Sequence, residues 1–250
     1  MTAAETYLVD GRQISADECQ QFFSGGTLGV RQLQVLGLIE GDIVVDVGCY
    51  SGLFVAELAR RNPRKTVIGI DYFDDNIRIA HLLFPNLRDR FRKMSIYQLD
   101  FADESVDCVT LQEVLEHLEG AGQAVKEVNR VLKTGGVAIV SVPNPFHWRD
   151  ILRFFRFEIG NGLRRLRGRP TRLSTEVFFD NVEWNRHIFS WTPQTLLTLF
   201  VVNGFEYAEH RYERAGSSWF ERGLLKLLPF LGATQILKVR KVAAAPATLV

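Results

Sequence analysis

The sequence predicts a single α/β domain in which a mostly parallel, doubly wound sheet carries helices on both faces. Short β-branched runs alternate with segments of helical periodicity from Ile43 to Val142, which is typical of repeated βαβ units. A chain of 250 residues with 46% hydrophobic residues also has enough apolar surface for one large core. Two independent domains are therefore not expected.

The first half of the pattern contains two strand–turn–helix units. Ile43–Val47 is a β-branched run ended by glycine, and 53–61 then places its apolar residues largely on one helical face. Val67–Ile70 predicts a second buried strand. Capping residues at 74–76 open the next helix, which Pro85 stops.

The second half continues the alternation and then closes the sheet. Residues 106–111 and 136–142 predict two further strands, and the helix between them, at 121–132, ends at a pair of glycines. Thr192-Pro193 opens a helix that ends at Asn203-Gly204. The segments 205–212 and 235–241 then alternate as an antiparallel closing pair.

Charge and cysteine usage exclude several classes of protein. Lys and Arg total 30 against 29 for Asp and Glu, so the formal charge of +1 provides no global field for nucleic acid. Cys19, Cys49 and Cys108 are odd in number and lack CxxC spacing, so we expect neither a disulfide framework nor a metal site. This cysteine usage favours a reducing cytoplasm.

No membrane-spanning or signal segment is predicted. The first ten residues lack the charged start and apolar run of a signal peptide. The longest apolar stretch, Leu224–Leu237, is interrupted by Lys226 and Pro229. We therefore expect a cytoplasmic protein, with peripheral contact at the inner membrane face as an option.

The loop after the first strand is a candidate ligand site. In a doubly wound sheet, ligands bind beyond the carboxyl ends of the strands, where the loop at 46–52 brings two glycines to the start of a helix. Asp71 ends the second strand, where a carboxylate can accept hydrogen bonds from both hydroxyls of a ribose. The alternative is a plain glycine turn followed by a helix-capping Asp.

Together these segments resemble the class I S-adenosylmethionine-dependent methyltransferases, especially the type 11-like group that acts on small molecules. The resemblance covers residues 43 to about 142, and more loosely 184–212. It rests on four blocks in the right order, which read VVDVGCYSG (44–52), VIGID (67–71), LDFADESVDCVTLQEVLEHL (99–118) and EVNRVLKTGGVAIVSVPN (127–144). It implies a Rossmann-like sheet of seven strands, mostly parallel with an antiparallel closing strand, plus a basic, aromatic lid insertion.

The resemblance also implies the cofactor and its site. Gly48 and Gly52 would shape the loop under the methionine part of S-adenosylmethionine, Asp46 would brace that loop, and Asp71 would hold the ribose. Amide and carboxylate groups after the fourth strand would border the sulfonium, which avoids a cationic wall. The residues placed at the cofactor, whose product form is S-adenosylhomocysteine, are Asp46, Gly48, Cys49, Tyr50, Gly52, Asp71, Tyr72, Ser95, Ile96, Gln112 and Glu113.

Two positions depart from the family pattern. Tyr50 stands where the family often has glycine, so its ring either covers the cofactor or is simply tolerated there. Ser95 stands where the family commonly has an acid for the adenine amine, and a hydroxyl accepts that hydrogen bond more weakly. These departures support an alternative in which the chain binds S-adenosylmethionine, or acts as a scaffold, without turnover.

Three histidines are candidates for the catalytic base, because histidine titrates near neutrality. His187 precedes a segment expected to return over the ligand end of the sheet, and we assign it the first place. His147 follows the fifth strand. His117 lies between Leu115 and Leu118, where simple helix packing is the competing interpretation.

The insert at 146–185 is basic and aromatic, and long inserts at a binding face are usually lids or substrate loops. It predicts contact with an anionic acceptor, such as a phosphorylated or lipid-linked sugar, or with an anionic membrane. The alternative is a solvated charged helix whose apolar face packs on the domain. Nucleic acid is not expected. The arginines are Arg149, Arg153, Arg156, Arg164, Arg165, Arg167, Arg169 and Arg172.

The predicted function is transfer of a methyl group from S-adenosylmethionine to a small-molecule acceptor, most simply a hydroxyl of a sugar, lipid-linked or other biosynthetic intermediate. A nicotinamide-dependent oxidoreductase is disfavoured, because the first loop lacks G-x-G-x-x-G spacing. The expected division is a helical N-terminal cover (1–40), a cofactor-binding core (41–145), a lid or substrate insertion (146–190), a closing helix and strands (191–242) and a tail (243–250).

Overall fold

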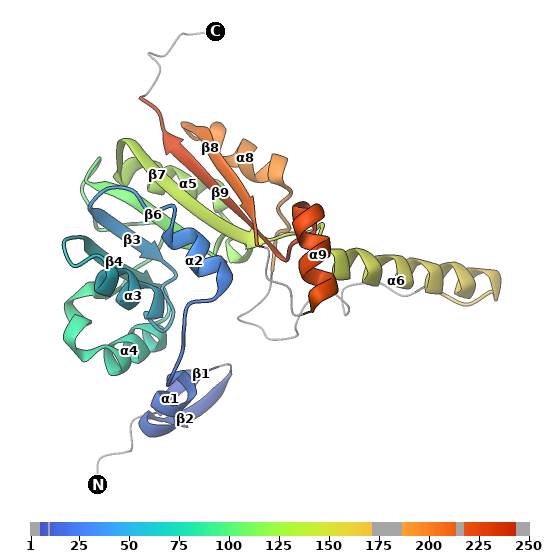
Figure 1. Ribbon diagram of the computed structural model, residues 1–250, viewed down its shortest axis with the longest axis horizontal. Coiled ribbons are helices and arrows are strands. Elements are labelled where there is room, and N and C mark those ends of the chain that lie inside the picture. The colour runs from blue at the N-terminus through green and yellow to red at the C-terminus, as the bar shows by residue number, and fades with distance from the viewer. Residues whose placement is uncertain (1–5, 10, 172–186, 214–217, 244–250) are drawn as a thin grey trace.

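A seven-stranded sheet forms the centre of the computed structural model, which describes residues 6–9, 11–171, 187–213 and 218–243 (Figure 1). Five neighbouring strands pair in parallel, and a sixth, β9, runs antiparallel between the last of these, β7, and the edge strand β8. In spatial order the strands are β5 (Phe91–Lys93), β4 (Thr66–Asp71), β3 (Ile43–Val47), β6 (Val106–Gln112), β7 (Leu132–Pro143), β9 (Thr234–Lys241) and β8 (Phe205–Tyr212). The predicted fold class is confirmed.

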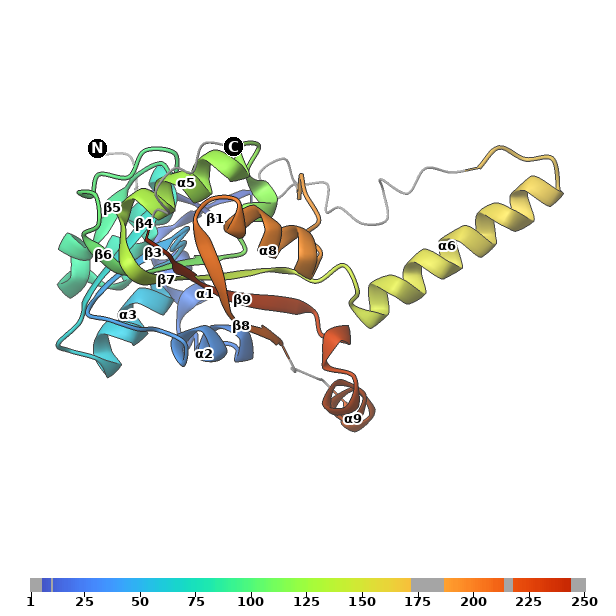
Figure 2. The same cartoon turned by 90° about the horizontal axis from the view of Figure 1, so that it is seen from above.

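Helices cover both faces of the sheet (Figure 2). Alternate strand residues explain this arrangement, since Val45 and Val109 pack into one core cluster while their chain neighbours Val44 and Cys108 pack into the other. One face carries α2 (Val30–Leu36), α3 (Leu53–Arg61) and α4 (Asp74–Leu83), and the opposite face carries α5 (Ala121–Val131) and α8 (Pro193–Val201).

The order of strands creates a switch point between β3 and β6. The chain leaves β3 toward β4 and β5 on one side, and then returns to build β6 and β7 on the other. In sheets of this kind the loops on the two sides of a switch point diverge, and ligands bind there, beyond the carboxyl ends of the strands. The fold therefore brings the loop at 48–52 and the segment at 112–117 to the same edge.

Two segments differ from the sequence-based expectation by more than a terminal residue. β7 begins at Leu132 rather than Gly136, because Leu132 pairs with Val106 across a register shift. The N-terminal cover is not only helical in the described residues. It opens with a hairpin of β1 (Thr6–Val9) and β2 (Arg12–Ser15), and α1 (Ala16–Phe23) follows.

The N-terminal hairpin and α1 form a small cluster against α4. Tyr7, Val9 and Cys19 bury their side chains there together with Ile79 of α4. Ser15 caps α1, and its side chain and that of Glu18 bond each other's backbone N–H groups reciprocally. This unit lies beside the first glycine loop.

The predicted insertion begins with a long helix, α6 (Trp148–Leu166), that projects away from the sheet (Figures 1 and 2). A shorter helix, α9 (Trp219–Leu227), contacts its base, and the short turns η1 (Pro85–Arg90), η2 (Leu115–His117) and η4 (Pro229–Leu231) complete the described elements. Arg172, the start of the looser resemblance at 184–186 and most of the predicted tail lie outside the described residues. No helix within the described ranges is long and apolar enough to cross a membrane.

Candidate functional site

The loop between β3 and α3 needs glycine at two positions. Gly48 and Gly52 have φ of 75° and 78°, in the left-handed region. A Cβ on Gly48 would lie 2.7 Å from Cγ2 of Val114, and one on Gly52 would lie 2.6 Å from Cε1 of Phe91. Both the backbone conformation and the lack of space therefore exclude a side chain at Gly48 and at Gly52. The loop stays thin at this edge of the sheet as a result.

Asp46 ties the start of this loop to the neighbouring strand. Its Oδ1 accepts hydrogen bonds from Oγ1 of Thr110 and, at 3.3 Å, from Nε2 of Gln112, both on β6. Burial raises the pKa of this carboxyl to about 6, against the hydrogen bonds that lower it. Asp46 thus braces the switch point from inside the sheet.

Asp71 lies at the end of β4, directly beside the glycine loop. Its Oδ2 accepts the backbone N–H of Tyr50 at 3.0 Å, and its Oδ1 accepts the N–H of Phe73 at 2.9 Å and Nδ2 of Asn76 at 3.0 Å. Burial raises the pKa of this carboxyl, while the three donors lower it. Oδ2 has the capacity for one more donor, whereas Oδ1 already has two.

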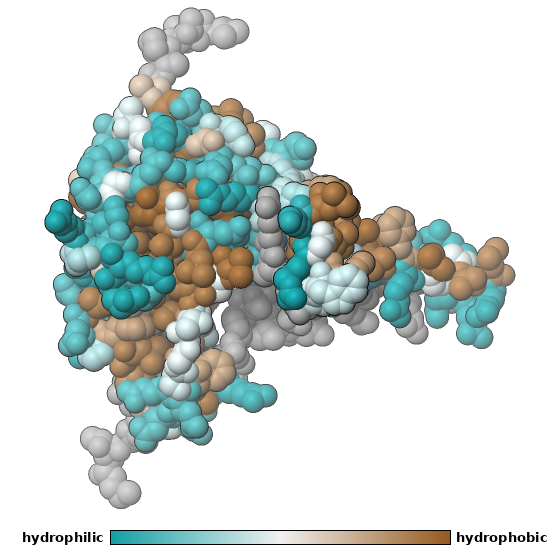
Figure 3. All heavy atoms as spheres, in the orientation of Figure 1, coloured by the Kyte–Doolittle hydropathy of each residue, from teal (hydrophilic) through white to brown (hydrophobic). Residues whose placement is uncertain are grey.

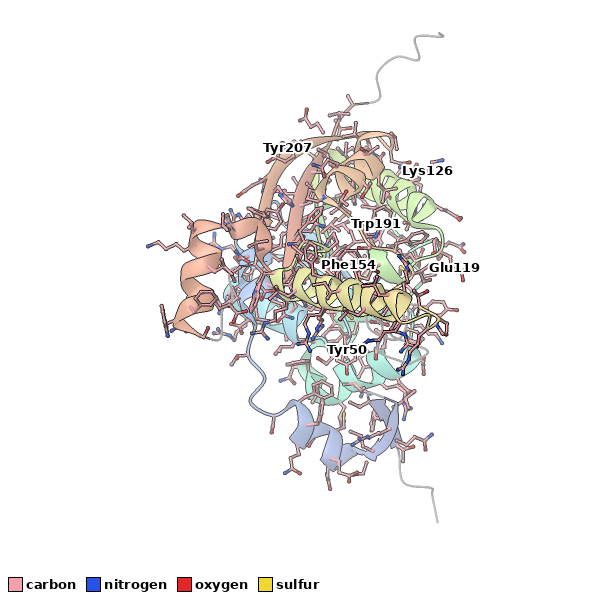
Figure 4. The ribbon with its side chains drawn as sticks, turned by 90° about the vertical axis from the view of Figure 1, so that its right-hand side faces the viewer. Tyr50, Glu119, Lys126, Phe154, Trp191 and Tyr207 are labelled. Carbon is pink, nitrogen blue, oxygen red and sulfur yellow. The ribbon has the colours of Figure 1, made fainter. Side chains whose placement is uncertain are left out.

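Aromatic side chains line the outer side of the same loop. Tyr50 adopts a φ of 48°, and its ring packs edge-on to Phe23 of α1 with 5.8 Å between centroids. Figure 4 looks from the side on which α6 projects, with Tyr50 below that helix and Trp191 above it. Tyr72 is 67% exposed beside Phe73. Cys49, in contrast, is buried, and burial raises the pKa of its thiol well above the usual value.

Ser95 and Ile96 follow β5 at the next position along the edge. The Ser95 hydroxyl accepts the N–H of Tyr97 at 3.3 Å, so it holds a tight turn and keeps its own O–H free to donate. Ile96 is buried in the core cluster under α5. This pair therefore supplies one hydroxyl and one apolar wall rather than a carboxylate.

The residues after β6 bring partly buried charge to the same edge of the sheet. Glu113 adopts a φ of 57°, and its Oε1 lies 3.4 Å from Nη1 of Arg31 on α2. Burial raises the pKa of Glu113, and the Arg31 cation lowers it. Nε of Arg31 and Oε1 of Gln112 are buried without a hydrogen-bond partner. Polar groups in this state are typical of a site that is completed by a ligand.

The structure brings two of the three candidate histidines together. The rings of His117 and His187 lie 4.9 Å apart at their centroids, and the chain beyond His187 is fixed by the N–H of Ile188, which donates to the Glu116 carbonyl at 2.7 Å. His147 is not part of this pair. Its Nδ1 lies 3.0 Å from Oδ2 of Asp150 at the base of α6.

Glu116 and Arg31 are the site residues that sequence reasoning missed. Glu116 is only 1% exposed, and neither of its carboxyl oxygens has a hydrogen-bond partner. Burial, followed by the nearby charge of Glu113, raises its pKa to about 8. The i,i+3 spacing of the two acids in the QEVLEH segment is visible in the sequence, but the burial of Glu116 is not.

Part of the chain is similar in sequence to known methyltransferases. Residues 45–140 match the family model described as a methyltransferase domain. A probable S-adenosylmethionine-dependent methyltransferase of Mycolicibacterium smegmatis is 36% identical over 127 residues, which cover 44% of this chain and 47% of the relative. A ubiquinone biosynthesis O-methyltransferase of Alkalilimnicola ehrlichii is 36% identical over 114 residues, which cover 44% and 45%. The chain thus spans about half the length of the curated relatives it matches.

Among solved structures, an S-adenosylmethionine-dependent methyltransferase from Mesorhizobium loti shares the fold with a TM-score of 0.58 at 14% identity. That likeness covers 85% of this chain and 98% of the other. The match argues against the nicotinamide-dependent alternative, because the donor of the matched family is S-adenosylmethionine. Residues 45–140 are thus similar to a methyltransferase domain, on a fold that this chain shares with an S-adenosylmethionine-dependent methyltransferase.

Proposed function

We propose that this chain transfers the methyl group of S-adenosylmethionine to a hydroxyl of a small-molecule acceptor. The observation that carries the proposal is the buried carboxylate of Asp71, which lies beside a loop kept thin by Gly48 and Gly52 at the switch point of the sheet. A ribose hydroxyl can donate to the remaining acceptor site on Oδ2. Binding through both hydroxyls requires one of the two donors on Oδ1 to yield.

The other end of the donor meets groups of matching charge. We assign the methionine carboxylate to Arg31, whose buried Nε has no hydrogen-bond partner. Gln112 and Glu113 are assigned to the ammonium and sulfonium, since a carboxylate and an amide oxygen stabilise a cation. The remaining residues assigned to the donor are Asp46, Cys49, Tyr50, Tyr72, Ser95 and Ile96, which brace the loop or line the adenosine.

Methyl transfer from a sulfonium is an in-line displacement, so the protein mainly aligns the acceptor and removes its proton. His187 and His117 lie together beside the segment after β6 that carries Gln112 and Glu113. We assign His187 to deprotonate or orient the acceptor hydroxyl, with His117 beside it. His147 is the weaker candidate because Asp150 already engages its ring.

A titration with S-adenosylhomocysteine tests the donor site. Asp71→Asn should weaken binding by about tenfold to a hundredfold, because a charge-assisted hydrogen bond becomes a neutral one. Asp74→Asn is the matched control at the start of α4, where the carboxylate lies 3.6 Å from Lys93 on the surface. Equal affinity in Asp71→Asn and the parent protein would remove the basis of the proposal, and so would stronger binding of NADH than of S-adenosylhomocysteine.

Turnover separates the enzyme from the alternative, a donor-binding protein without catalysis. Release of S-adenosylhomocysteine should be detectable over a panel of phenols, sugars and lipid-linked hydroxyl compounds. With a responsive acceptor, His187→Ala should lower kcat by about a hundredfold or more, as expected for loss of general base catalysis. Binding of the donor with no release over the whole panel would favour the non-catalytic alternative.

We also propose that α6 lies on an anionic lipid surface and delivers the protein to a lipid-linked acceptor. Leu152, Phe155, Ile159 and Leu163 recur at helical spacing and are between 49% and 63% exposed. Figure 3 shows hydrophobic side chains at the surface along α6 and on α9. These exposures argue against the alternative in which the apolar face of the insert packs on the domain.

The positive charge beside the apolar row of α6 also supports contact with an anionic lipid surface. Arg153 and Arg156 follow the apolar row at adjacent helical positions, where long cationic side chains reach lipid phosphates while the apolar row enters the acyl boundary. Trp219 of α9, 80% exposed, adds an interfacial aromatic near the base of α6.

Sedimentation with vesicles rich in phosphatidylglycerol tests this contact. Ile159→Asp should abolish co-sedimentation, whereas Val202→Asp, the same change at a residue 72% exposed after α8, should not. Binding should also weaken as salt rises, because the arginine contribution is screened. Absence of sedimentation at low salt, or equal loss in both variants, would contradict the proposal.

A further inference from the structure

Three side chains that the chain brings together from distant segments have the composition of a metal site. Glu116 and His117 belong to η2 after β6, whereas His187 begins the described segment that leads into α8. One ligand atom from each residue lies within 4.8 Å of the other two. We propose that these three residues bind a divalent transition-metal ion, with Zn²⁺ or Mn²⁺ as the matching ions.

The carboxyl group of Glu116 is the first reason. It is buried to 1% exposure, and both of its oxygens lack a hydrogen-bond partner. Its Oε1 lies 4.0 Å from Nε2 of His117, which is too far for a hydrogen bond. Buried polar groups in native proteins are nearly always satisfied, so this carboxyl lacks a partner that a bound cation would supply.

The donor set is the second reason. Two imidazoles and one carboxylate are the three protein ligands of many catalytic zinc centres, which leave a further position open for substrate or water. Such ligands bind at about 2.0 to 2.2 Å from the ion, so modest rotation of these side chains brings all three to one centre. Imidazole nitrogen also favours Zn²⁺ or Mn²⁺ over Mg²⁺, which prefers oxygen ligands and water.

The backbone around the cluster is already fixed. The Glu116 carbonyl accepts the N–H groups of Ile188 at 2.7 Å and Phe189 at 3.2 Å, which hold the two halves of the site together. Glu113 lies three residues earlier with a second, partly buried carboxyl, which forms an ion pair with Arg31. It offers a fourth ligand or a negative charge close to the ion.

The spacing of the cysteines predicted no metal site, whereas the proposed site consists of a glutamate and two histidines. The site uses none of the three cysteines. Its role in the reaction rests on the proposed function, because a hydroxyl acceptor bound to such an ion loses its proton at a lower pH. In that state His187 and His117 act as ligands rather than as bases. Binding of the ion itself does not depend on the proposed reaction.

The test is a binding measurement on tag-free, full-length protein after treatment with a chelator. Calorimetric titration with ZnCl₂ and MnCl₂ should give one ion per chain, and MgCl₂ should bind far more weakly. Glu116→Gln and His187→Ala should each weaken binding by about tenfold or more, as loss of a ligand does. His81→Gln is the matched control, since His81 bonds backbone carbonyls near β5 instead.

A spectroscopic measurement separates ligation from folding. Co²⁺ added to the chelator-treated protein should give visible absorption bands that His187→Ala removes, while circular dichroism without metal is unchanged. The proposal is overturned if no ion binds at millimolar concentration, or if His81→Gln loses as much affinity as Glu116→Gln. S-adenosylhomocysteine titration of the same samples reports the donor site separately, so failure there leaves the metal result standing.

Discussion

Gly52 is constrained both by its backbone conformation and by the lack of space for a side chain. Its φ of 78° lies in a region that costs an L-residue about 1 to 2 kcal/mol, and its missing side chain leaves room for the ring of Phe91. Gly48 has the same pair of constraints against Val114. The thin loop beside Asp71 therefore depends on the absence of a side chain at both glycine positions.

Gly52→Ala should destabilise the protein by about 2 to 5 kcal/mol, since backbone strain and overpacking add. Gly122→Ala is the matched control, because Gly122 lies in the first turns of α5, where an added Cβ would meet nothing within 4 Å. That change should be neutral or stabilise by up to about 1 kcal/mol. Urea unfolding measures both, and equal effects in the two variants would contradict the argument.

Asp46 gives a pH dependence whose sign follows from its burial. Its pKa in the folded chain is about 6, above the ordinary value for Asp, so the folded state holds a proton that the unfolded chain releases. The stability from this group is therefore complete at low pH and is lost as pH rises through about 6. The loss amounts to a few kcal/mol, on the order of 1.4 kcal/mol per pKa unit.

Asp46→Asn should flatten the unfolding free energy between pH 4 and pH 6, because the amide imitates the protonated acid and still accepts from Thr110. The measurement is urea unfolding at a series of pH values. Asp89→Asn, at an exposed position, should leave the profile of the parent protein intact. If Asp46→Asn instead keeps the parent's slope, Asp46 titrates normally in the folded chain.

At the scale of elements, local sequence patterns predict the ends of a helix or strand when nearby residues alone determine them. The helix at 53–61, the strand at 205–212 and the Pro193 helix start were predicted as the structure has them, because periodicity and capping act over a few residues. The predicted start of β7 was wrong. It depends on the pairing of Leu132 with Val106, which no local pattern encodes.

The residues of the candidate site fall into the same two groups: those that local patterns predict, and those that depend on contacts between distant segments. Asp71 and the two glycines could be predicted, since each follows a recognisable strand. Glu116 and Arg31 could not, because their importance lies in burial and in a neighbour from another segment. The pairing of His117 with His187 was also hidden, since it requires the chain beyond α6 to return to η2.

An acid of α9 contacts the base of the projecting helix α6. Glu221 of α9 is buried and accepts from Nε1 of Trp148 at 3.2 Å and Nη2 of Arg149 at 3.3 Å. Removal of this carboxylate leaves two donors without this partner. The base of α6 should then open more often, although the donor site does not change.

Glu221→Ala should therefore raise amide hydrogen exchange in α9 and in the first turns of α6, and leave affinity for S-adenosylhomocysteine within about twofold. Glu158→Ala, at an exposed position on α6, is the control that should change neither quantity. Exchange that stays at the parent's level in Glu221→Ala would show that other contacts hold the helix.

At the scale of the whole molecule, the residues that match the family model are not a complete core. The strand pair β9 and β8 covers the edge of β7, and Leu237 and Val239 are buried in the same cluster as Val140. Phe200 of α8 is fully buried there as well. The expected division at residue 145 therefore separates a cofactor site from part of the apolar core that supports it.

A chain ending at residue 145 should accordingly fail to unfold cooperatively in urea and should bind S-adenosylhomocysteine at least about tenfold more weakly than the full chain. The reason is that loss of β9 exposes an apolar β7 edge and removes Phe200 from the larger core cluster. A chain ending at residue 243 is the control, because it retains every described strand and should match the full chain in both measurements. Cooperative unfolding of the shorter chain at the parent's midpoint would instead mean that residues 45–140 form an independent folding unit and that the closing strands only extend it.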